Sequence, residues 1–220
     1  MDECAIRVDN LTVRFGEQPV LEGVSLGLET GAKASLTGPS GSGKSTVLRC
    51  IMGFLVPDAG AVYVEGERLT VETVWRLRTK LAYVAQEPDI GAGTVREILQ
   101  RPFRYRANAH IEDNLAHAPA LFERFLLPQA LLDKDVTALS GGEKQRVAVI
   151  SCLLLGRRIV LLDEASSALD DAAAEAVAGY FRARENLTVL SVSHDRRGFH
   201  FSDHTIALPG GDEETRHGRS

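Results

Sequence analysis

An eight-residue segment, Gly38-Pro-Ser-Gly-Ser-Gly-Lys-Ser45, limits the possible folds of this 220-residue chain more than any other feature. It matches the pattern G-x-x-x-x-G-K-[ST] in full, and its glycines allow backbone N–H groups to turn inward around phosphate oxygens. The pattern requires a strand before it and a helix after it, and the sequence predicts both, over residues 34–37 and 45–53. We therefore expect an α/β domain that binds a nucleotide, and a chance glycine-rich turn is the weaker interpretation.

The side chains of this segment have distinct predicted roles. Lys44 supplies a positive charge for the β- and γ-phosphates, the Ser45 hydroxyl can ligate Mg²⁺, and Thr46 can reach the α-phosphate. The remaining positions are predicted to line the phosphates: Gly38, Pro39, Ser40, Gly41, Ser42 and Gly43. The ligands that these residues imply are a nucleoside triphosphate and Mg²⁺.

A second segment, Ile159-Val-Leu-Leu-Asp-Glu164, is an apolar strand that ends in two carboxylates. Asp163 is placed to hold Mg²⁺ through water, as a partner of Ser45. Glu164 extends past the strand end, where it can polarise a water molecule for attack on the γ-phosphate. A lone Asp-Glu pair would more simply be a solvated strand terminus, but the phosphate-binding segment upstream favours the catalytic interpretation.

A third segment, Leu139-Ser-Gly-Gly-Glu-Lys-Gln-Arg-Val147, opens a predicted helix with a serine and two glycines. Such an opening presents free backbone N–H groups, a hydroxyl and the positive end of the helix dipole, so it suits an anion. The chain already has one complete phosphate cradle, and this second anion site therefore needs an explanation.

Turn residues and apolar runs divide the chain into regions of different character. Strand-like stretches at 6–15 (a strand pair), 20–28 and 61–64 predict an antiparallel β region. The buried runs at 81–85, 159–162 and 187–192 predict central parallel strands, with an alanine-rich helix over 170–184. Residues 87–136 contain four prolines, helical patches and no clear strand. Trp75 is expected to pack within the helix before residue 81.

The predicted fold class is α/β: a P-loop NTPase (RecA-like) core with an N-terminal antiparallel β subdomain and an inserted α-helical subdomain. We divide the single domain, residues 1–220, into a nucleotide-binding core with the β subdomain (1–86 and 137–208), the helical subdomain (87–136) and a polar tail (209–220).

Charge, cysteine content and hydropathy limit the possible partners and the cellular compartment of the protein. The net charge of −5 disfavours broad nucleic-acid binding, and Cys4, Cys50 and Cys152 are too scattered for a disulfide framework or a zinc site. No apolar run reaches the roughly 18 residues that a membrane helix needs. Acidic Asp2 and Glu3 follow Met1, so no signal peptide is expected. These features predict a cytosolic protein with reduced thiols.

The motifs together resemble those of the ATP-binding-cassette (ABC) ATPases, over about residues 6–208. Leu139-Ser-Gly-Gly-Glu143 resembles the family's signature motif, and Ser167-Ala-Leu-Asp170 resembles its D-loop. The resemblance implies that Gln86 is the Q-loop glutamine and shares Mg²⁺ with Ser45 and Asp163. It also implies that His194 is the switch histidine, which makes the expected catalytic set Glu164, His194, Lys44 and Gln86.

The resemblance also implies how the base and the second anion site are used. Phe15 lies 29 positions before Lys44, where the family has an aromatic residue that stacks on adenine. Family members dimerise head to tail, so Ser140, Gly141 and Gly142 would contact the γ-phosphate of an ATP held by a second copy of the chain. The implied reaction is hydrolysis of ATP to ADP and phosphate by a homodimer.

A solitary cassette of this family normally powers a separate integral membrane permease. The resemblance therefore implies a cytoplasmic subunit at the inner face of the membrane, with a groove around Pro88–Leu99 for a cytoplasmic helix of the permease. A likeness to the Fet (Ybb) type of ATP-binding subunit, which is linked to iron export, rests on residues 121–128, 138–147 and 164–170.

Two alternatives stay open. One is a soluble ABC ATPase, such as an iron–sulfur cluster assembly ATPase, and the other is a non-enzymatic phosphate-binding module. No guanine-reading Asn-Lys-x-Asp motif occurs, so ATP is the preferred nucleotide.

Overall fold

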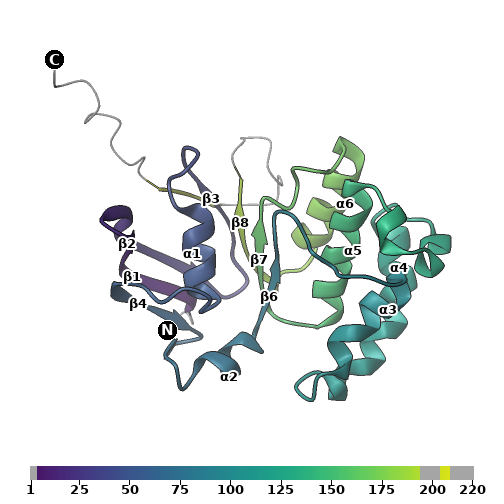
Figure 1. Ribbon diagram of the computed structural model, residues 1–220, viewed down its shortest axis with the longest axis horizontal. Helices are drawn as coiled ribbons and strands as arrows, with labels where there is room; N and C mark the ends of the chain where they lie inside the picture. Colours follow the sequence, from purple (N-terminus) through teal and green to yellow (C-terminus); the bar gives the residue numbers. More distant parts are fainter. Residues whose placement is uncertain (1–3, 194–203, 209–220) are drawn as a thin grey trace.

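The computed structural model describes residues 4–193 and 204–208, which form two β-sheets with helices beside them (Figure 1). The first sheet is antiparallel, with the strand order β2-β1-β4-β5. Its strands are β1 (Cys4–Phe15), β2 (Gln18–Glu29), β4 (Ala59–Val64) and β5 (Glu67–Arg68). This sheet confirms the predicted antiparallel region.

The prediction of a strand pair within residues 6–15 is wrong, because β1 is one strand of 12 residues. Asn10 has a positive φ of 47°, a conformation that asparagine tolerates better than most residues. The register of β1 on β4 shifts between Asp9 and Thr12. The irregularity around Asn10 therefore interrupts a continuous strand, which is paired along both edges.

The second sheet has five strands in the order β6-β7-β8-β3-β9, all parallel. Its strands are β3 (Lys33–Thr37), β6 (Leu81–Val84), β7 (Ile159–Asp163), β8 (Thr188–Val192) and β9 (His204–Ala207). The three strands β3, β7 and β8 are almost wholly buried, as expected for a sheet covered on both faces. Their carboxyl ends lie at one edge, where α/β sheets of this kind bind ligands.

Helices cover both faces of the parallel sheet (Figure 1). On one side α1 (Lys44–Ile51) packs in a core that also includes residues of the antiparallel sheet. On the other side α5 (Gly141–Leu154) and α6 (Asp171–Arg182) belong to a second core. The parallel sheet thus separates α1 from α5.

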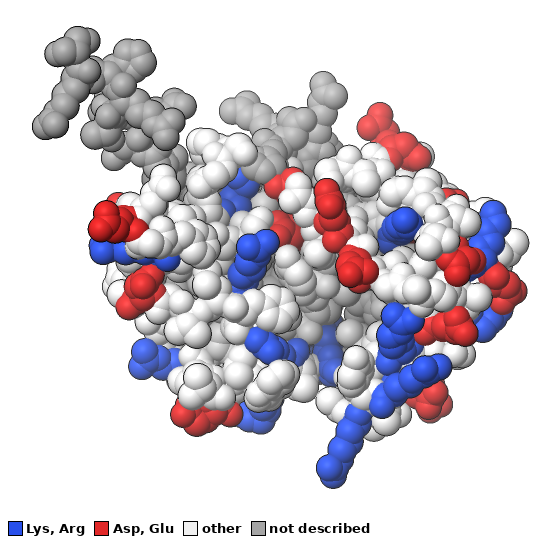
Figure 2. Space-filling view, in the orientation of Figure 1, with Lys and Arg blue, Asp and Glu red and all other residues white. Residues whose placement is uncertain are grey.

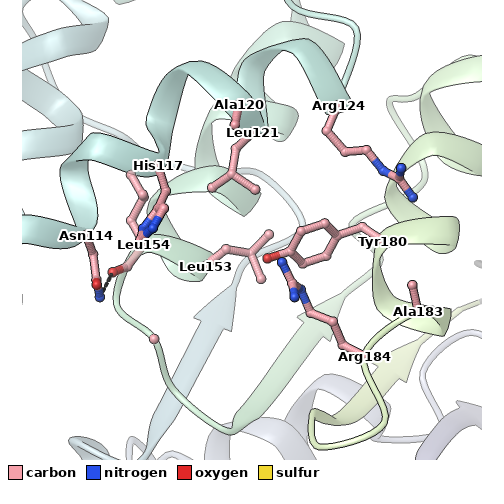
Figure 3. Close-up of a pocket in the computed structure, with 11 residues that line it drawn as sticks. Asn114, His117, Ala120, Leu121, Arg124, Leu153, Leu154, Tyr180, Ala183 and Arg184 are labelled. Atoms are coloured by element: carbon pink, nitrogen blue, oxygen red, sulfur yellow. Dashed lines mark hydrogen bonds between the residues drawn. The ribbon is translucent and has the colours of Figure 1, made fainter.

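Between β6 and α5 the chain forms short helices. They are α3 (Val95–Gln100), η1 (Arg101–Arg104), η2 (Ala109–His117), α4 (Ala118–Arg124), η3 (Gln129–Asp133) and η4 (Val136–Ala138). Asn114 donates a 2.9 Å hydrogen bond to the carbonyl oxygen of Leu154, at the end of α5 (Figure 3). A cavity between α4, α5 and α6 lies at this junction, and Tyr180 points into it (Figure 3). The bounds 87–136 of the helical subdomain stay a prediction from the sequence.

Trp75 departs from expectation. It lies in the five-residue helix α2 (Val74–Arg78), and 74% of its surface is exposed. The Arg78 guanidinium carbon lies 4.9 Å from the centre of the indole ring. The ring therefore stacks on a cation at the surface in place of packing in a core.

Candidate active site

The start of α1 is shaped by Gly43. This residue is the N-cap, with a φ of 87°, and no side chain caps the helix. A Cβ atom at Gly43 would lie 2.5 Å from Cδ2 of Leu21, so the position needs glycine on grounds of both conformation and space. The first N–H groups of α1 are thereby left without a side-chain acceptor, which favours an anion in that place.

Two polar side chains of the loop segment, Lys44 and Ser42, are buried. The Lys44 ammonium donates to the carbonyl oxygens of Gly38 (2.9 Å) and Pro39 (2.7 Å). Burial lowers the pKa of Lys44, and the nearby carboxylates of Glu164 and Asp163 partly offset this. The buried Ser42 hydroxyl has no hydrogen-bond partner among the described residues. Burial of a hydroxyl without a hydrogen-bond partner lowers the free energy of unfolding. A ligand oxygen that accepts a hydrogen bond from this hydroxyl would remove that penalty.

Asp163 stands at the end of β7 and is only 3% exposed. Its Oδ1 atom accepts a 2.8 Å hydrogen bond from Ser45, as the sequence predicted for two residues that share a site. Its Oδ2 atom accepts a 3.0 Å hydrogen bond from the hydroxyl of Tyr83 in β6. Burial, followed by the charge of Asp163, raises the pKa of Tyr83. Tyr83 was not foreseen, and its only signal in the sequence was a hydroxyl within a predicted buried strand.

The donor set fits Mg²⁺. Ser45 and Asp163 offer a hydroxyl and a carboxylate oxygen side by side, and oxygen ligands are those that Mg²⁺ prefers. In residues 4–193 and 204–208 there is no group of three or more His, Cys, Asp or Glu side chains able to hold a metal. A protein that supplies few ligands matches the usual Mg²⁺ site in which phosphates and water complete the shell.

Glu164, the second carboxylate, adopts an unusual backbone conformation with a φ of 49°. Its N–H group donates to the carbonyl oxygen of Val192 (3.1 Å), which ties it to the end of β8. Its Oε2 atom accepts a 2.7 Å hydrogen bond from Nε2 of Gln86. The structure therefore brings together two predicted catalytic residues that are 78 positions apart, and such strained backbone is common at active sites.

The start of α5 is built differently from that of α1. Ser140 is its N-cap, and the Ser140 hydroxyl accepts from the N–H of Glu143 (3.3 Å) while the Glu143 carboxylate accepts from the N–H of Ser140 (2.8 Å). These hydrogen bonds from Ser140 lower the pKa of Glu143. A Cβ at Gly142 would lie 2.8 Å from the carbonyl oxygen of Ala168, so this glycine permits close backbone packing. Ser140 and Gly141 are exposed.

Two further residues were predicted for the site, Phe15 and His194. Phe15 ends β1 and is 55% exposed, in the hairpin whose Leu21 packs near Gly43. Its ring is therefore accessible to a nucleotide base. His194, the predicted switch histidine, lies outside the described residues.

The fold and the site together define a P-loop nucleotide-binding domain in which the glycine-rich loop, Asp163 and Glu164 meet at one edge of a parallel sheet. A sequence model of the ABC transporter family matches residues 21–167. The chain belongs to this family, as an ATP-binding, ATP-hydrolysing cassette.

Individual relatives agree with this assignment. The energy-coupling factor transporter ATP-binding protein EcfA1 of Streptococcus pyogenes is 36% identical over 207 residues, which are 90% of this chain and 72% of the relative. The ABC transporter cassette MJ0796, solved as a dimer, is 27% identical with a TM-score of 0.79, and the match covers 92% of this chain and 94% of that one. The CbiO1 structure from Clostridium perfringens, described as part of the ABC transporter complex cbiONQ, has a TM-score of 0.78. At 19% identity, with 94% of this chain and 85% of that one covered, CbiO1 supports the fold alone.

Proposed function

We propose that this chain hydrolyses ATP as a dimer and thereby energises a separate integral membrane permease. The observation that carries the proposal is the pairing of Glu164 with Gln86 next to the Ser45–Asp163 pair. This geometry supports Glu164 as the general base and Asp163 as a metal ligand at the same edge of the sheet.

In the proposed reaction, ATP and water yield ADP and phosphate. Lys44, the Ser42 hydroxyl and the free N–H groups of α1 hold the phosphates and neutralise charge that develops on the transferred group. Glu164, oriented by Gln86, accepts a proton from the attacking water. Bound Mg²⁺, held by Ser45, Asp163 and Gln86, would supply Lewis-acid stabilisation of the phosphate oxygens. Phe15 would stack on adenine, and His194 would contact the γ-phosphate.

The dimer follows from the separation of the two anion sites. The parallel sheet stands between α1 and α5, the helix whose N-cap is Ser140 (Figure 1). A second copy can bring Ser140, Gly141 and Gly142 onto an ATP bound at α1, in a two-fold arrangement that buries two nucleotides. The dimeric MJ0796 cassette, which has also been solved bound to ADP and Pi, supports this arrangement.

A groove beside the edge strand β6 supports a permease partner. It lies between β6, α5 and the 88–105 segment. Its lining includes apolar and aromatic residues such as Ile90, Ile98 and Tyr105, and polar residues such as Asp89 and Arg101. In residues 4–193 and 204–208 no helix combines the length and apolarity needed to cross a bilayer. We place the protein at the cytoplasmic face of the membrane, held there by the permease.

The transported substrate is a separate question. The Fet (Ybb) likeness suggested iron export, but none of the relatives named above is described as an iron exporter. We therefore propose transport without a defined substrate and keep metal export as the narrower hypothesis. On the face shown in Figure 2, acidic and basic side chains are interspersed, and the partners that we propose are a second copy of the chain and a permease.

The central test is Glu164→Gln, which keeps the shape of the side chain but removes its charge. Hydrolysis should fall by about 10²- to 10⁴-fold, and the protein should elute as a dimer in size-exclusion chromatography with ATP and Mg²⁺. Lys80→Ala, at a surface ion pair with Glu65, is the control and should behave as wild type. A Glu164→Gln protein that hydrolyses ATP at the wild-type rate, or that stays monomeric with ATP, would contradict the proposal.

The membrane assignment needs its own experiment. Affinity purification of the tagged chain from detergent-solubilised membranes should recover a polytopic membrane protein. Recovery of iron–sulfur cluster assembly proteins from the soluble fraction would favour the soluble alternative.

A further inference from the structure

Tyr83 contacts Asp163, the predicted metal ligand, at the carboxylate oxygen that Ser45 does not contact. Its hydroxyl donates to Oδ2 of Asp163 at 3.0 Å, while Ser45 donates to Oδ1 at 2.8 Å. Each oxygen of this buried carboxylate thus has its own donor. With both oxygens engaged, the carboxylate plane cannot rotate freely, so its remaining lone pairs keep one orientation.

The Tyr83 ring is also held from the opposite direction, by the segment that follows α1. The ring of Phe54 meets it edge-on, with centroids 6.2 Å apart and an interplanar angle of 78°. Arg78 fixes this segment, because it donates to the carbonyl oxygens of Met52 (2.8 Å) and Gly53 (2.7 Å) and stacks on Phe54 at 4.8 Å. Edge-to-face aromatic pairs of this geometry are stabilising.

This arrangement extends from the buried carboxylate to the surface. Phe54 is 57% exposed although it is large and apolar, and Tyr83 itself lines the groove described above. The backbone carbonyl of Tyr83 accepts a 3.1 Å hydrogen bond from the Cys152 thiol of α5, so its strand is anchored while its ring spans the space between Phe54 and Asp163. A displacement of Phe54 would therefore act on the ring of Tyr83 more than on its backbone.

We propose that Tyr83 is a positioning residue: its hydroxyl fixes the Asp163 carboxylate for the metal ion, and its ring links that carboxylate to the exposed Phe54. This inference rests on the proposed function, and it adds a route by which a contact at the exposed Phe54 can alter the Mg²⁺ requirement of the site.

The test is the Mg²⁺ dependence of nucleotide binding, measured by titration of a fluorescent ATP analogue at increasing Mg²⁺ and again in EDTA. Tyr83→Phe removes only the hydroxyl, so the Mg²⁺ concentration for half-maximal enhancement should rise about tenfold, a usual effect of losing a hydrogen bond to a metal-ligating carboxylate. Binding in EDTA should stay unchanged, because the phosphate loop is intact. Tyr63→Phe, on β4 in the other sheet where Arg7 stacks on the ring, is the matched control.

A second variant distinguishes the loss of the hydroxyl from a defect in folding. Tyr83→Met also lacks the hydroxyl and should show the same rise, with circular dichroism confirming the fold of both variants. Unchanged Mg²⁺ dependence in either folded variant would overturn the role of Tyr83. A wild-type protein that binds ATP equally well with Mg²⁺ and with EDTA would instead contradict the proposed function.

A separate variant tests the link between Tyr83 and the exposed Phe54. Phe54→Ala removes the edge contact but leaves the Tyr83 hydroxyl in place, and it should raise the Mg²⁺ requirement in the same direction by a smaller factor. A Phe54→Ala protein with the wild-type requirement would overturn the link to the exposed face and leave only the Asp163 contact.

Discussion

The starts of α1 and α5 are both glycine- and serine-containing helix openings, but they are satisfied in different ways. At α1 the N-cap is Gly43, in a left-handed conformation with no side-chain cap, and Lys44 beside it is buried. At α5 the N-cap is the exposed Ser140, whose hydroxyl and N–H group are engaged by Glu143. One opening is left without a cap in the free chain, and the other is already completed by its own glutamate.

This difference explains how the two anion sites of one chain can have different roles. An anion at α1 meets uncapped N–H groups and a fixed ammonium, so it can bind to a single subunit. An anion at Ser140 must compete with the Glu143 carboxylate, so the site favours a ligand that another surface already holds. The proposed role of α5, to close on an ATP bound by the partner subunit, is consistent with this order of events.

The largest expected effect is at the α1 opening. Lys44→Ala removes the ammonium that neutralises phosphate charge, so ATP binding should weaken sharply and hydrolysis should fall by at least about 10²-fold. Isothermal titration calorimetry with ATP and Mg²⁺ checks the first result and a phosphate-release assay the second. Wild-type ATP affinity in Lys44→Ala would mean that α1 is not the primary site.

A different outcome is expected at the α5 opening. Ser140→Arg should abolish turnover and ATP-dependent dimerisation, because the long side chain blocks close approach of a second subunit, while ATP affinity of the monomer stays near that of wild type. Titration calorimetry and size-exclusion chromatography separate these effects. Ser25→Arg, at an exposed position of β2, controls for the added charge. A loss of ATP affinity in Ser140→Arg would contradict the trans arrangement.

The smallest effect concerns the cap itself. Glu143→Ala should lower the free energy of unfolding by about 1 kcal/mol, as is usual when a capping interaction is lost, whereas Glu143→Gln retains an acceptor and should cost less. Because the pKa of Glu143 is lowered in the folded state, its charge stabilises the protein above the ordinary carboxyl pKa of about 4.3.

This stabilisation should disappear as the pH falls through the lowered folded-state pKa of Glu143. Urea unfolding at pH 7 and pH 3 measures the change. A stability difference between wild type and Glu143→Gln that is larger at pH 3 than at pH 7 would refute the capping interpretation.

Much of the site was predictable because its motifs are local in the chain. The roles proposed for Lys44 and Ser45 need only a strand, a glycine-rich turn and a helix, and the structure has all three. The contact between Ser45 and Asp163 was also foreseeable, since the ends of parallel strands meet at one edge. The strand pair in residues 6–15 and the packing of Trp75 were mispredicted, because alternation and apolarity do not reveal which neighbour covers a residue.

The sequence by itself determined the chemistry of each segment: a phosphate loop, an acidic strand end and a capped helix opening. Only the tertiary structure decided which of them meet. Strand order brings Gln86 to Glu164 and Tyr83 to Asp163, and it leaves α5, the helix that Ser140 caps, on the opposite side of the sheet from α1. The physical reason is that a short motif fixes backbone conformation through local sterics and hydrogen bonds. Contacts between distant segments depend instead on sheet register and on the burial of shared cores, which no single stretch of sequence contains.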